Sequence, residues 1–431
     1  MKRIFLGLMF LIIIGTASGQ DAVSYNRFSF EDCLNYAFSN NYNLQSLKLT
    51  EEARTDAYEQ SKKERLPSLS ASASENLSHS KGSDAVTSGS VGFSSSLTLY
   101  QGGTIGNTIE QNRLRKEQSA YQTSQYNNTL TIQILQAFLT VLGNEELLKY
   151  QQYVIEASEE QFRQGGDRYR AGQILESDYL LLEAQLANDK NNVLNTQISR
   201  DNSLLALKNL LAMPASVNLQ IISPDTAVIQ AMGILPPMND VMQQTFQTLP
   251  DLKISQYNIN IAKTGVKLSK AGYLPSISLH GSVGTGHTDF NNFGTQLTDR
   301  LNEQIGVSLS IPIYDNNRTK SKVTQSRIAL QQAELDKKQN ELDIEQTVVT
   351  EYQGVVSAFS KYQTTGIRQN AYSKTFDVYR AQFGEGAITT VDLLQQQNNY
   401  ISALNDYIQS KYEFILKRKI LDVYMGNQIT M

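Results

Sequence analysis

Apolar residues recur at helical spacing over two long stretches in the first half of the chain. From about 101 to 167 the sequence has no proline, and one helical face carries Leu130, Ile134, Phe138 and Val141. At about 1.5 Å per residue, this helix would span roughly 100 Å. A helix over 179–211, about half as long, follows a turn at 169–178. The pattern predicts a helical hairpin whose second arm covers only half of the first.

The same pattern occurs again 214 residues further along. Under this shift Tyr169, Gly172 and Asp178 fall on Phe383, Gly386 and Asp392, respectively. Under a shift of 208 residues, Leu-Pro-Ser-Leu-Ser at 66–70 falls on Leu-Pro-Ser-Ile-Ser at 274–278. A repeat of this length indicates an internal duplication. The helical hairpins are therefore expected at 101–211 and 317–425.

The half-length helices need partners to fill the space beside the long ones. Their lengths predict that 179–211 stacks end to end with 240–272 beside the first long helix. They likewise predict that 393–425 stacks on about 30–63 beside the second long helix. The chain ends and the linker would then meet halfway along the helices as a belt.

Four shorter segments alternate apolar residues with small polar ones. They lie at about 68–78, 88–100, 276–286 and 304–314. Such alternation predicts strands with one buried face, and about ten residues is the length that a tilted strand needs to cross a bilayer. The second face is mostly Ser, Gly and Thr, as in a water-filled lumen, although Glu75 interrupts the apolar face of the first strand. Hairpins packed on a soluble core would show the same alternation, and we favour the membrane interpretation.

Four strands cannot close a transmembrane barrel, because known barrels begin at about eight strands. Open strand edges in lipid would leave backbone groups without hydrogen bonds. Three copies of the chain would supply twelve strands. The expected fold is therefore mainly α with a transmembrane β-barrel: a homotrimeric twelve-stranded barrel on an α-helical barrel built from the duplicated hairpins.

The N-terminus has the features of a secretory signal, with Lys2-Arg3, an apolar run over 4–14 and small residues up to Gly19. We expect a signal peptide at 1–19, a first repeat at 20–214, a linker at 215–240 and a second repeat at 241–431. After the signal no run of some twenty apolar residues occurs, so no transmembrane helix is expected.

Charge and cysteine content narrow the function classes further. The net charge is −4 and the basic residues are dispersed, so nucleic acid is not expected as a partner. Cys33, the only cysteine, has no intrachain partner and is expected in the core of a helix that begins with the capping box Ser29-Phe-Glu-Asp32.

These features together resemble the TolC-like outer-membrane efflux channels. The resemblance rests on the signal, the duplicated halves, the Leu-Pro-Ser segments before the strands, and the turns with Tyr169, Gly172 and Asp178. It implies a homotrimeric channel in outer-membrane lipid that extends across the periplasm of a Gram-negative bacterium. It also implies a periplasmic adaptor and an inner-membrane pump of the RND, ABC or MFS type as partners, in drug efflux or type I secretion.

The resemblance assigns a periplasmic entrance to the turns. The residues that map onto the family's gate are Asp392, Gln395, Ser177, Asp178, Phe383 and Ile388. Three copies of Asp392 would form an acidic ring, weakened by Gln395 at the second acidic position, while a helix-capping role explains each Asp equally well. Phe383 and Ile388 replace the family's polar partners, so closure is expected to rest on apolar packing or on other contacts.

The turns are also the expected docking surface for the adaptor. The residues assigned to docking are Arg170, Gly172, Gly384 and Gly386. No metal-spaced cluster, phosphate loop or nucleophile motif occurs, so neither an enzyme nor a cofactor is expected. A structural periplasmic spacer without a pore is the alternative function.

Overall fold

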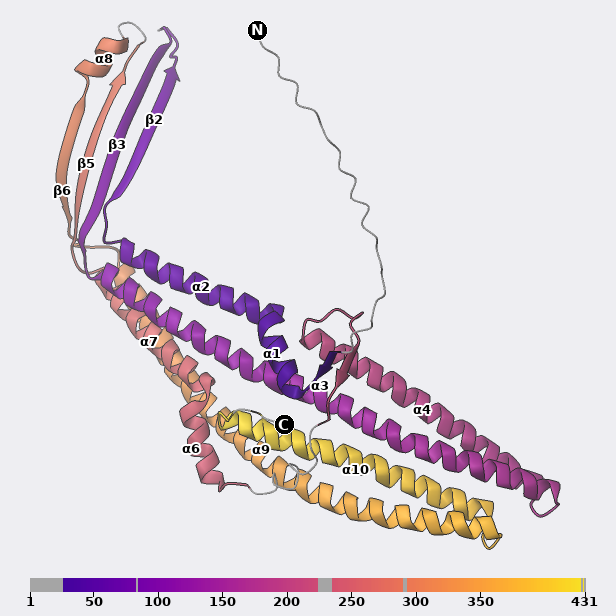
Figure 1. Ribbon diagram of the computed structural model, residues 1–431. Coiled ribbons are helices and arrows are strands. Elements are labelled where there is room, and N and C mark those ends of the chain that lie inside the picture. The colour runs from indigo at the N-terminus through magenta and orange to yellow at the C-terminus, as the bar shows by residue number, and fades with distance from the viewer. Residues whose placement is uncertain (1–25, 83, 224–234, 290–292, 428, 430–431) are drawn as a thin grey trace, which may run out of the picture.

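The computed structural model is elongated, with four long strands at one end and two helical turns at the other (Figure 1). It describes residues 26–82, 84–223, 235–289, 293–427 and 429. The expected signal peptide and residues 224–234 of the linker lie outside this description.

Two helices of nearly equal length connect the strands to the turns. The helix α3 (Thr104–Arg170) has 67 residues and α9 (Arg318–Glu385) has 68. Each therefore spans about 100 Å. Both confirm the long helices predicted from the sequence.

Apart from the short α8 (Phe293–Asp299), which lies between β5 and β6, the remaining helices also occur as duplicated pairs. The arms of the hairpins are α4 (Glu176–Leu210) and α10 (Thr390–Tyr424), and the helices nearer the strands are α1 (Phe30–Asn40), α2 (Tyr42–Lys63), α6 (Met238–Thr248) and α7 (Pro250–Ala271). The helix expected over 240–272 is interrupted at Leu249, which has ψ of 125°. The residue before a proline disfavours the helical conformation, so the break precedes Pro250.

The end-to-end stacking of the helices differs from our prediction. Asn41, which caps α2, donates a hydrogen bond from Nδ2 to the Leu210 carbonyl at the end of α4 (3.0 Å). Both α2 and α4 pack along α3, whereas α10 packs along α9, and Gly426, two residues past the end of α10, lies against Thr248 at the end of α6. The predicted pairing of 179–211 with 240–272 is therefore wrong, as is that of 393–425 with 30–63. Length could not decide between them, because α2 and α7 both have 22 residues.

The strands form one antiparallel sheet in the order β2-β3-β5-β6. Their bounds are β2 (Ser68–Ser78), β3 (Val86–Gln101), β5 (Ser276–His287) and β6 (Asn302–Ser310). The fourth strand was predicted to reach residue 314 but ends at Ser310. Pro312 has no N–H to donate to a strand ladder, which explains the early end.

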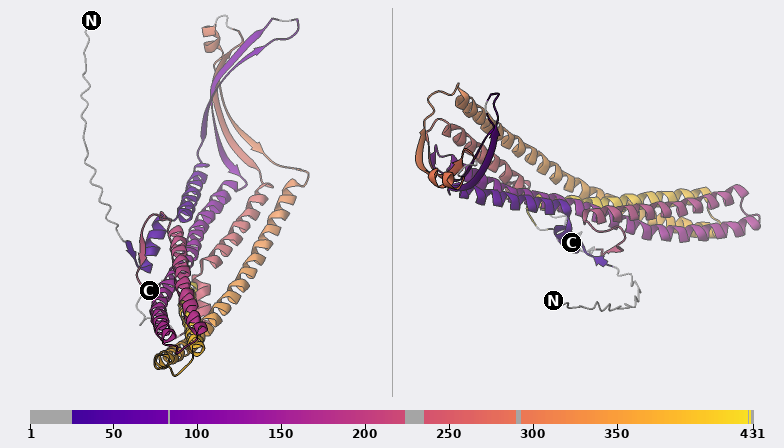
Figure 2. Two further views of the ribbon diagram at one scale, coloured as in Figure 1. Left: turned by 90° about the vertical axis from the view of Figure 1, so that its right-hand side faces the viewer. Right: turned by 90° about the horizontal axis from the view of Figure 1, so that it is seen from above.

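The two faces of the sheet differ as the alternation predicts. Large apolar side chains stand exposed on one face, including Leu69, Phe93, Ile305, Val307 and Leu309. On the other face serine hydroxyls of β2 and β3 meet in pairs, such as Ser68 with Ser96 and Ser70 with Ser94, both at 2.8 Å. Figure 2 shows this sheet standing clear of the helices at one end of the molecule.

Glu75, which interrupts the apolar face, has a specific partner. Its Oε2 lies 2.9 Å from Nε2 of His287, two strands away. Gly89 of the intervening strand pairs with both residues, and a Cβ at Gly89 would lie 2.1 Å from the Glu75 carboxylate. The missing side chain at Gly89 therefore gives this pair its space.

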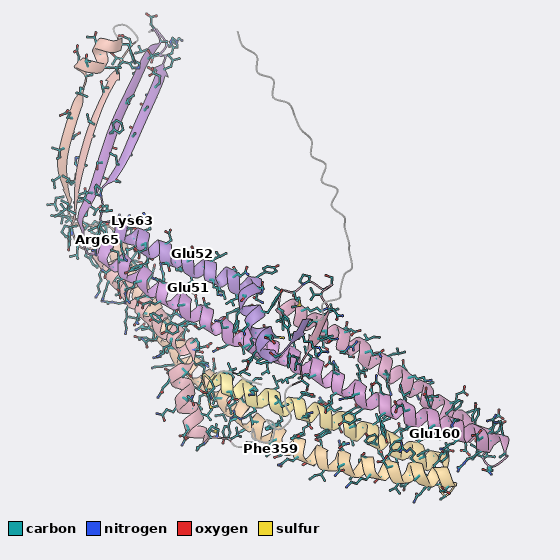
Figure 3. All side chains as sticks on the ribbon, viewed as in Figure 1. Glu51, Glu52, Lys63, Arg65, Glu160 and Phe359 are labelled. Carbon is teal, nitrogen blue, oxygen red and sulfur yellow. The ribbon has the colours of Figure 1, made fainter. Side chains whose placement is uncertain are left out.

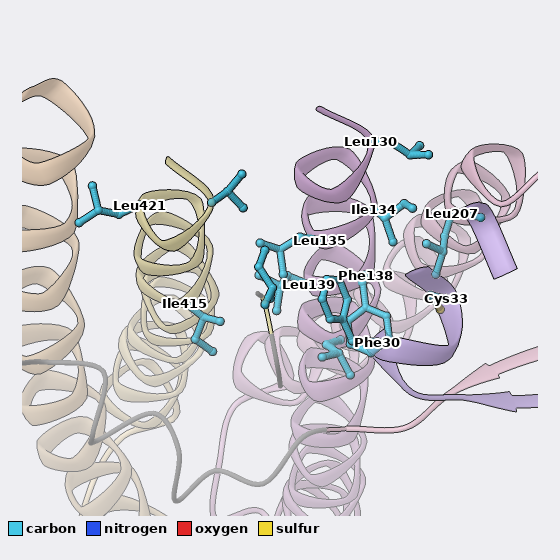
Figure 4. Close-up of a cluster of buried hydrophobic side chains, with 14 of the residues drawn as sticks. Phe30, Cys33, Leu130, Ile134, Leu135, Phe138, Leu139, Leu207, Ile415 and Leu421 are labelled. Carbon is cyan, nitrogen blue, oxygen red and sulfur yellow. The ribbon is translucent and has the colours of Figure 1, made fainter. Parts of the chain in front are cut away.

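The first and last described segments lie at the middle of the long helices, as predicted. The strand β1 (Asn26–Phe28) pairs in parallel with β4 (Leu219–Ile221), a pair that the sequence analysis did not predict. Beside it, Cys33 is fully buried near Phe30 and Phe138 (Figure 4). The capping box of Ser29 and Asp32 is present at the start of α1. The belt is thus held by an apolar core.

Charged side chains are spread along the helices, as Glu51, Glu52 and Lys63 on α2 and Glu160 on α3 show (Figure 3). Within the described part of the chain, every helix is too short or too polar to be a candidate membrane span.

Candidate functional site at the helical turns

The two hairpin turns have the same backbone. Gly172 and Gly386 have φ of +72° and +77°, values that glycine adopts without strain. The next amide in each turn bonds back to the helix: Gln173 N donates to Arg168 O (2.8 Å) and Ala387 N donates to Gln382 O (2.9 Å). This is the glycine-based helix stop expected from the sequence.

The helices that follow the turns begin differently. Thr389 caps α10, and Asp392 Oδ2 accepts hydrogen bonds from Thr389 Oγ1 (2.6 Å) and Thr389 N (3.3 Å). The equivalent residue before α4 is Leu175, whose side chain makes no capping bond to Asp178 or its neighbours. The helix-capping interpretation therefore describes Asp392 and not Asp178.

Several predicted gate residues lie exposed at the turns. Ser177 and Asp392 are exposed, and so is Gln395, one helical turn beyond Asp392. The Gln395 amide donates to Asn399 Oδ1 (3.2 Å), on the same helix. Asp178 is half-buried at the third position of α4, where the helix dipole favours a carboxylate.

The two apolar gate residues belong to the core of the chain itself. Phe383 is only 1% exposed, in a cluster with Leu182, Phe376 and Leu393, and Ile388 packs against this cluster. Phe383 is therefore enclosed by both hairpins.

One residue that the sequence analysis missed connects the two hairpins at this end. Arg168 Nη2 donates to the Gly384 carbonyl (2.6 Å), and its guanidinium lies 5.0 Å from the centre of the Phe383 ring. The contact stabilises a carbonyl in the last turn of α9, where a positive charge is favoured. Its duplicate position is Gln382, so the repeat pattern gave no sign of this role.

Arg170, the arginine predicted to contact the adaptor, has partners only on its own helix. It donates to Asp167 Oδ1 (2.6 Å) and its side chain is 77% exposed. Gly172, Gly384 and Gly386 are exposed beside it, and a Cβ added at Gly172 or Gly384 would meet nothing within 4 Å. The turns thus offer an open surface of small residues.

Polar contacts continue between the hairpins away from the turns. The carboxylate of Glu146 on α3 accepts hydrogen bonds from Lys411 Nζ and Tyr412 Oη of α10, both at 2.7 Å. Burial, followed by the hydrogen bond to Glu146, raises the pKa of the Tyr412 hydroxyl above its ordinary range. Tyr412 therefore remains a hydrogen-bond donor at physiological pH.

These contacts hold helices of the two hairpins together. Among the described residues, no three His, Cys, Asp or Glu side chains are grouped to hold a metal ion. Glu159 and Glu160, adjacent on α3, pair separately with Lys190 (3.0 Å) and Arg163 (2.6 Å) at exposed positions.

Comparisons with known proteins match both repeats. A family model described as outer membrane efflux protein matches residues 33–213 and 241–427. The outer membrane protein TolC of Vibrio cholerae is 23% identical over 390 residues, covering 89% of this chain and 87% of that protein. The TolC of Escherichia coli is 21% identical over 331 residues, covering 74% of this chain and 65% of its own length.

A crystal structure of CusC, from a study of its folding and transmembrane channel formation, has a similar fold. Its TM-score is 0.79 at 16% sequence identity, with 93% of this chain and 92% of that chain covered.

Proposed function

The chain belongs to the outer membrane efflux protein family, and we propose that it is the passive conduit of a tripartite efflux or type I secretion system. Three copies would pool their sheets into a twelve-stranded barrel in the outer membrane. The helices would continue the tunnel across the periplasm to a periplasmic adaptor. An inner-membrane pump, of the RND, ABC or MFS type, would supply the energy.

The observation that supports a conduit best is the two-faced sheet. Its apolar face carries side chains as exposed as Ile305 (82%) and Leu69 (77%), which a soluble protein would bury. Its other face carries serine pairs and glycine, which suit a water-filled lumen. A periplasmic spacer without a pore has no use for either face in this form.

The test is single-channel conductance of the purified protein in a planar lipid bilayer. Stepwise current of uniform size is expected from trimers that insert through their sheets. A protein that stays in solution under every lipid condition, and never carries current, would contradict the conduit and favour the spacer.

We place a cation-selective constriction at Asp392, because three exposed carboxylates around one axis attract cations and repel anions. Asp392→Asn removes the charge but keeps an oxygen that can cap α10. Thr389→Ala removes the capping hydroxyl and keeps the charge. Loss of cation preference in Asp392→Asn alone supports the ring, whereas equal behaviour of the two variants would reduce Asp392 to a cap.

Closure of the tunnel would rest on Arg168, Phe383 and Ile388 rather than on a polar network around Ser177 and Asp178. Arg168 ties α3 to the end of α9, and the two apolar residues fill the space beneath it. At the turns, the closed state would thus be held by the Arg168 contact above an apolar cluster.

Docking of the adaptor is assigned to the surface of Arg170, Gly172, Gly384 and Gly386. Gly384→Phe would place a bulky ring on this surface where nothing obstructs it. Gly106→Phe, equally unobstructed but near the sheet, is the matched control. Only the first substitution is expected to weaken binding of the adaptor, measured by surface plasmon resonance. Equal binding of both variants would move the docking surface elsewhere.

A further inference from the structure

A buried carboxylate joins three helices between the turns and the belt. Asp189 of α4 is 3% exposed. Its Oδ2 accepts hydrogen bonds from Ser158 Oγ of α3 (2.6 Å) and from Gln397 Nε2 of α10 (2.8 Å), and its Oδ1 accepts one from Gln185 Nε2 (3.0 Å). Gln397 also donates to Ser158 Oγ (2.7 Å). The Asp189 carboxylate thus joins α3 and α4 of the first hairpin to α10 of the second.

The partners of Asp189 are neutral, so its charge is uncompensated within the cluster. Glu159 and Lys190, its charged neighbours on α3 and α4, pair with each other at an exposed edge (3.0 Å). On α10 the titratable residue nearest to Gln397 in sequence is Tyr400, whose ring stacks on Phe376 (5.6 Å). Burial raises the pKa of the Asp189 carboxyl, and the hydrogen bonds from Ser158, Gln185 and Gln397 oppose that rise.

The contact surface between α10 and the first hairpin is polar around Asp189, and some of its polar atoms have no hydrogen bond. Gln397 Oε1, both amide atoms of Gln161 and Thr390 Oγ1 are buried without a hydrogen-bond partner among the described residues. Gln161 lies one helical turn from Ser158, and Thr390 begins α10. A buried polar atom without a hydrogen-bond partner destabilises the packed state, and it would regain hydrogen bonds to water if the helices separated. The packing of α10 against the first hairpin is therefore weaker here than in the apolar core.

We propose that Asp189 is a proton-binding site that couples periplasmic pH to the separation of the second hairpin from the first. This inference rests on the proposed function, in which the two hairpins bound the tunnel. Separation would expose Asp189 to water, so that the pKa of its carboxyl would return to the ordinary value of an aspartate. The site takes a proton as its ligand and belongs to the first repeat alone, because the duplicate positions of Ser158 and Asp189 are Tyr372 and Ala403.

Proton binding favours the closed state, in which the second hairpin packs against the first. The closed state has the higher pKa at Asp189, so it keeps the proton when the open state has already lost it. Closure is fully supported below the ordinary pKa of an aspartate and weakens as pH rises toward the raised one. Each pKa unit between the two states changes the ratio of closed to open protein about tenfold. Raising the pH should therefore favour separation of the two hairpins near their turns.

The experiment measures the spacing of the turns directly. Spin labels are placed at Gln173→Cys and Ala387→Cys, both exposed, in a Cys33→Ala background. Labelled chains are co-assembled with excess unlabelled chain, so that distances within one chain dominate the double electron–electron resonance signal. Over about pH 4 to about pH 8, which spans the ordinary aspartate pKa and the range above it, the distance should lengthen as pH rises.

Two substitutions at the cluster test the assignment and one controls for charge. Asp189→Asn should hold the short distance at every pH. Ser158→Ala, which removes a donor that stabilises the carboxylate, should extend the change to higher pH and enlarge it. Glu183→Gln, an exposed acid on the same helix, should behave as the parent. A pH response that persists in Asp189→Asn, or one that is unchanged in Ser158→Ala, would overturn the inference.

Conductance separates this inference from the proposed function. If the protein conducts in bilayers but the label distance does not change with pH, the conduit is supported and the proton site is contradicted. If the distance changes as expected but the protein never conducts, the conduit is contradicted instead.

Discussion

Tyr169 and Phe383 occupy the same position in the two repeats, but 40% of Tyr169 is exposed and only 1% of Phe383 is. Tyr169 stacks on Tyr179 within its own hairpin, at 5.4 Å between ring centres. Phe383 lies between the hairpins and beneath Arg168. The same backbone turn therefore carries a ring that packs within its own hairpin in the first repeat and a buried ring that packs between the two hairpins in the second.

The starts of the following helices show the same asymmetry. Thr389 and Asp392 form a capping box before α10, whereas Leu175 stands at the corresponding position before α4. The second turn has thus acquired both a local cap and a long-range contact. The two turns therefore differ in their contacts although their backbones match.

Truncation of the two aromatic residues should give the largest difference. Phe383→Ala removes a fully buried ring, and such changes cost about 3–5 kcal/mol. Tyr169→Ala removes a half-exposed stack worth about 0.5–1.5 kcal/mol beyond area burial. Hydrogen-exchange protection of α9 and α10 near the turn should fall sharply in the first variant and little in the second. Similar losses in both would show that the two turns are equally packed.

The two arginines of the first turn should differ next. Arg168→Ala loses a hydrogen bond to a carbonyl and a contact with Phe383, together about 1–2 kcal/mol at this partly exposed site. That free energy corresponds to a change of about 5- to 30-fold in the ratio of closed to open protein.

Single-channel recordings should therefore show a larger open fraction for Arg168→Ala. Arg170→Ala, whose ion pair with Asp167 is exposed, should leave the recordings nearly unchanged. If the open fraction rises in Arg170→Ala and not in Arg168→Ala, the contact of Arg168 with Gly384 does not hold the turns together.

The smallest expected effect concerns the helix caps. Thr389→Ala should destabilise the start of α10 by about 1 kcal/mol. Leu175→Thr, which is exposed and stands three residues before Asp178, should install the missing capping box and stabilise α4 by a similar amount. Exchange protection of the first turn of each helix is the measurement. A gain at α4 without any loss at α10 would mean that Asp392 caps its helix without help from Thr389.

Much of the architecture was predictable because it depends on short-range periodicity. The long helices, the four strands and the glycine turns each follow from spacing within a few residues, and the duplication confirmed each assignment with a second copy. The capping box at Asp392 was predictable for the same reason, since Thr389 lies three residues away.

The contacts that control the turns were not predictable in this way. Arg168 and Gly384 are separated by 216 residues, and Gln397 and Asp189 by 208. Nothing in the local pattern distinguishes Arg168 from Arg170, or Asp189 from the exposed acids around it. The stacking of the half-length helices was predicted wrongly for a related reason, because the two candidate partners, α2 and α7, have equal length.

By itself, the sequence determined the long helices, the four strands of the large sheet, their duplication, the two faces of that sheet and the location of the turns. Only the tertiary structure decided that Arg168 and Asp189 join the two hairpins and that Phe383 is enclosed between them. The physical reason is that periodicity records which face of an element is buried, whereas a hydrogen bond between elements depends on how their axes are placed. That placement comes from packing over the whole length of the helices.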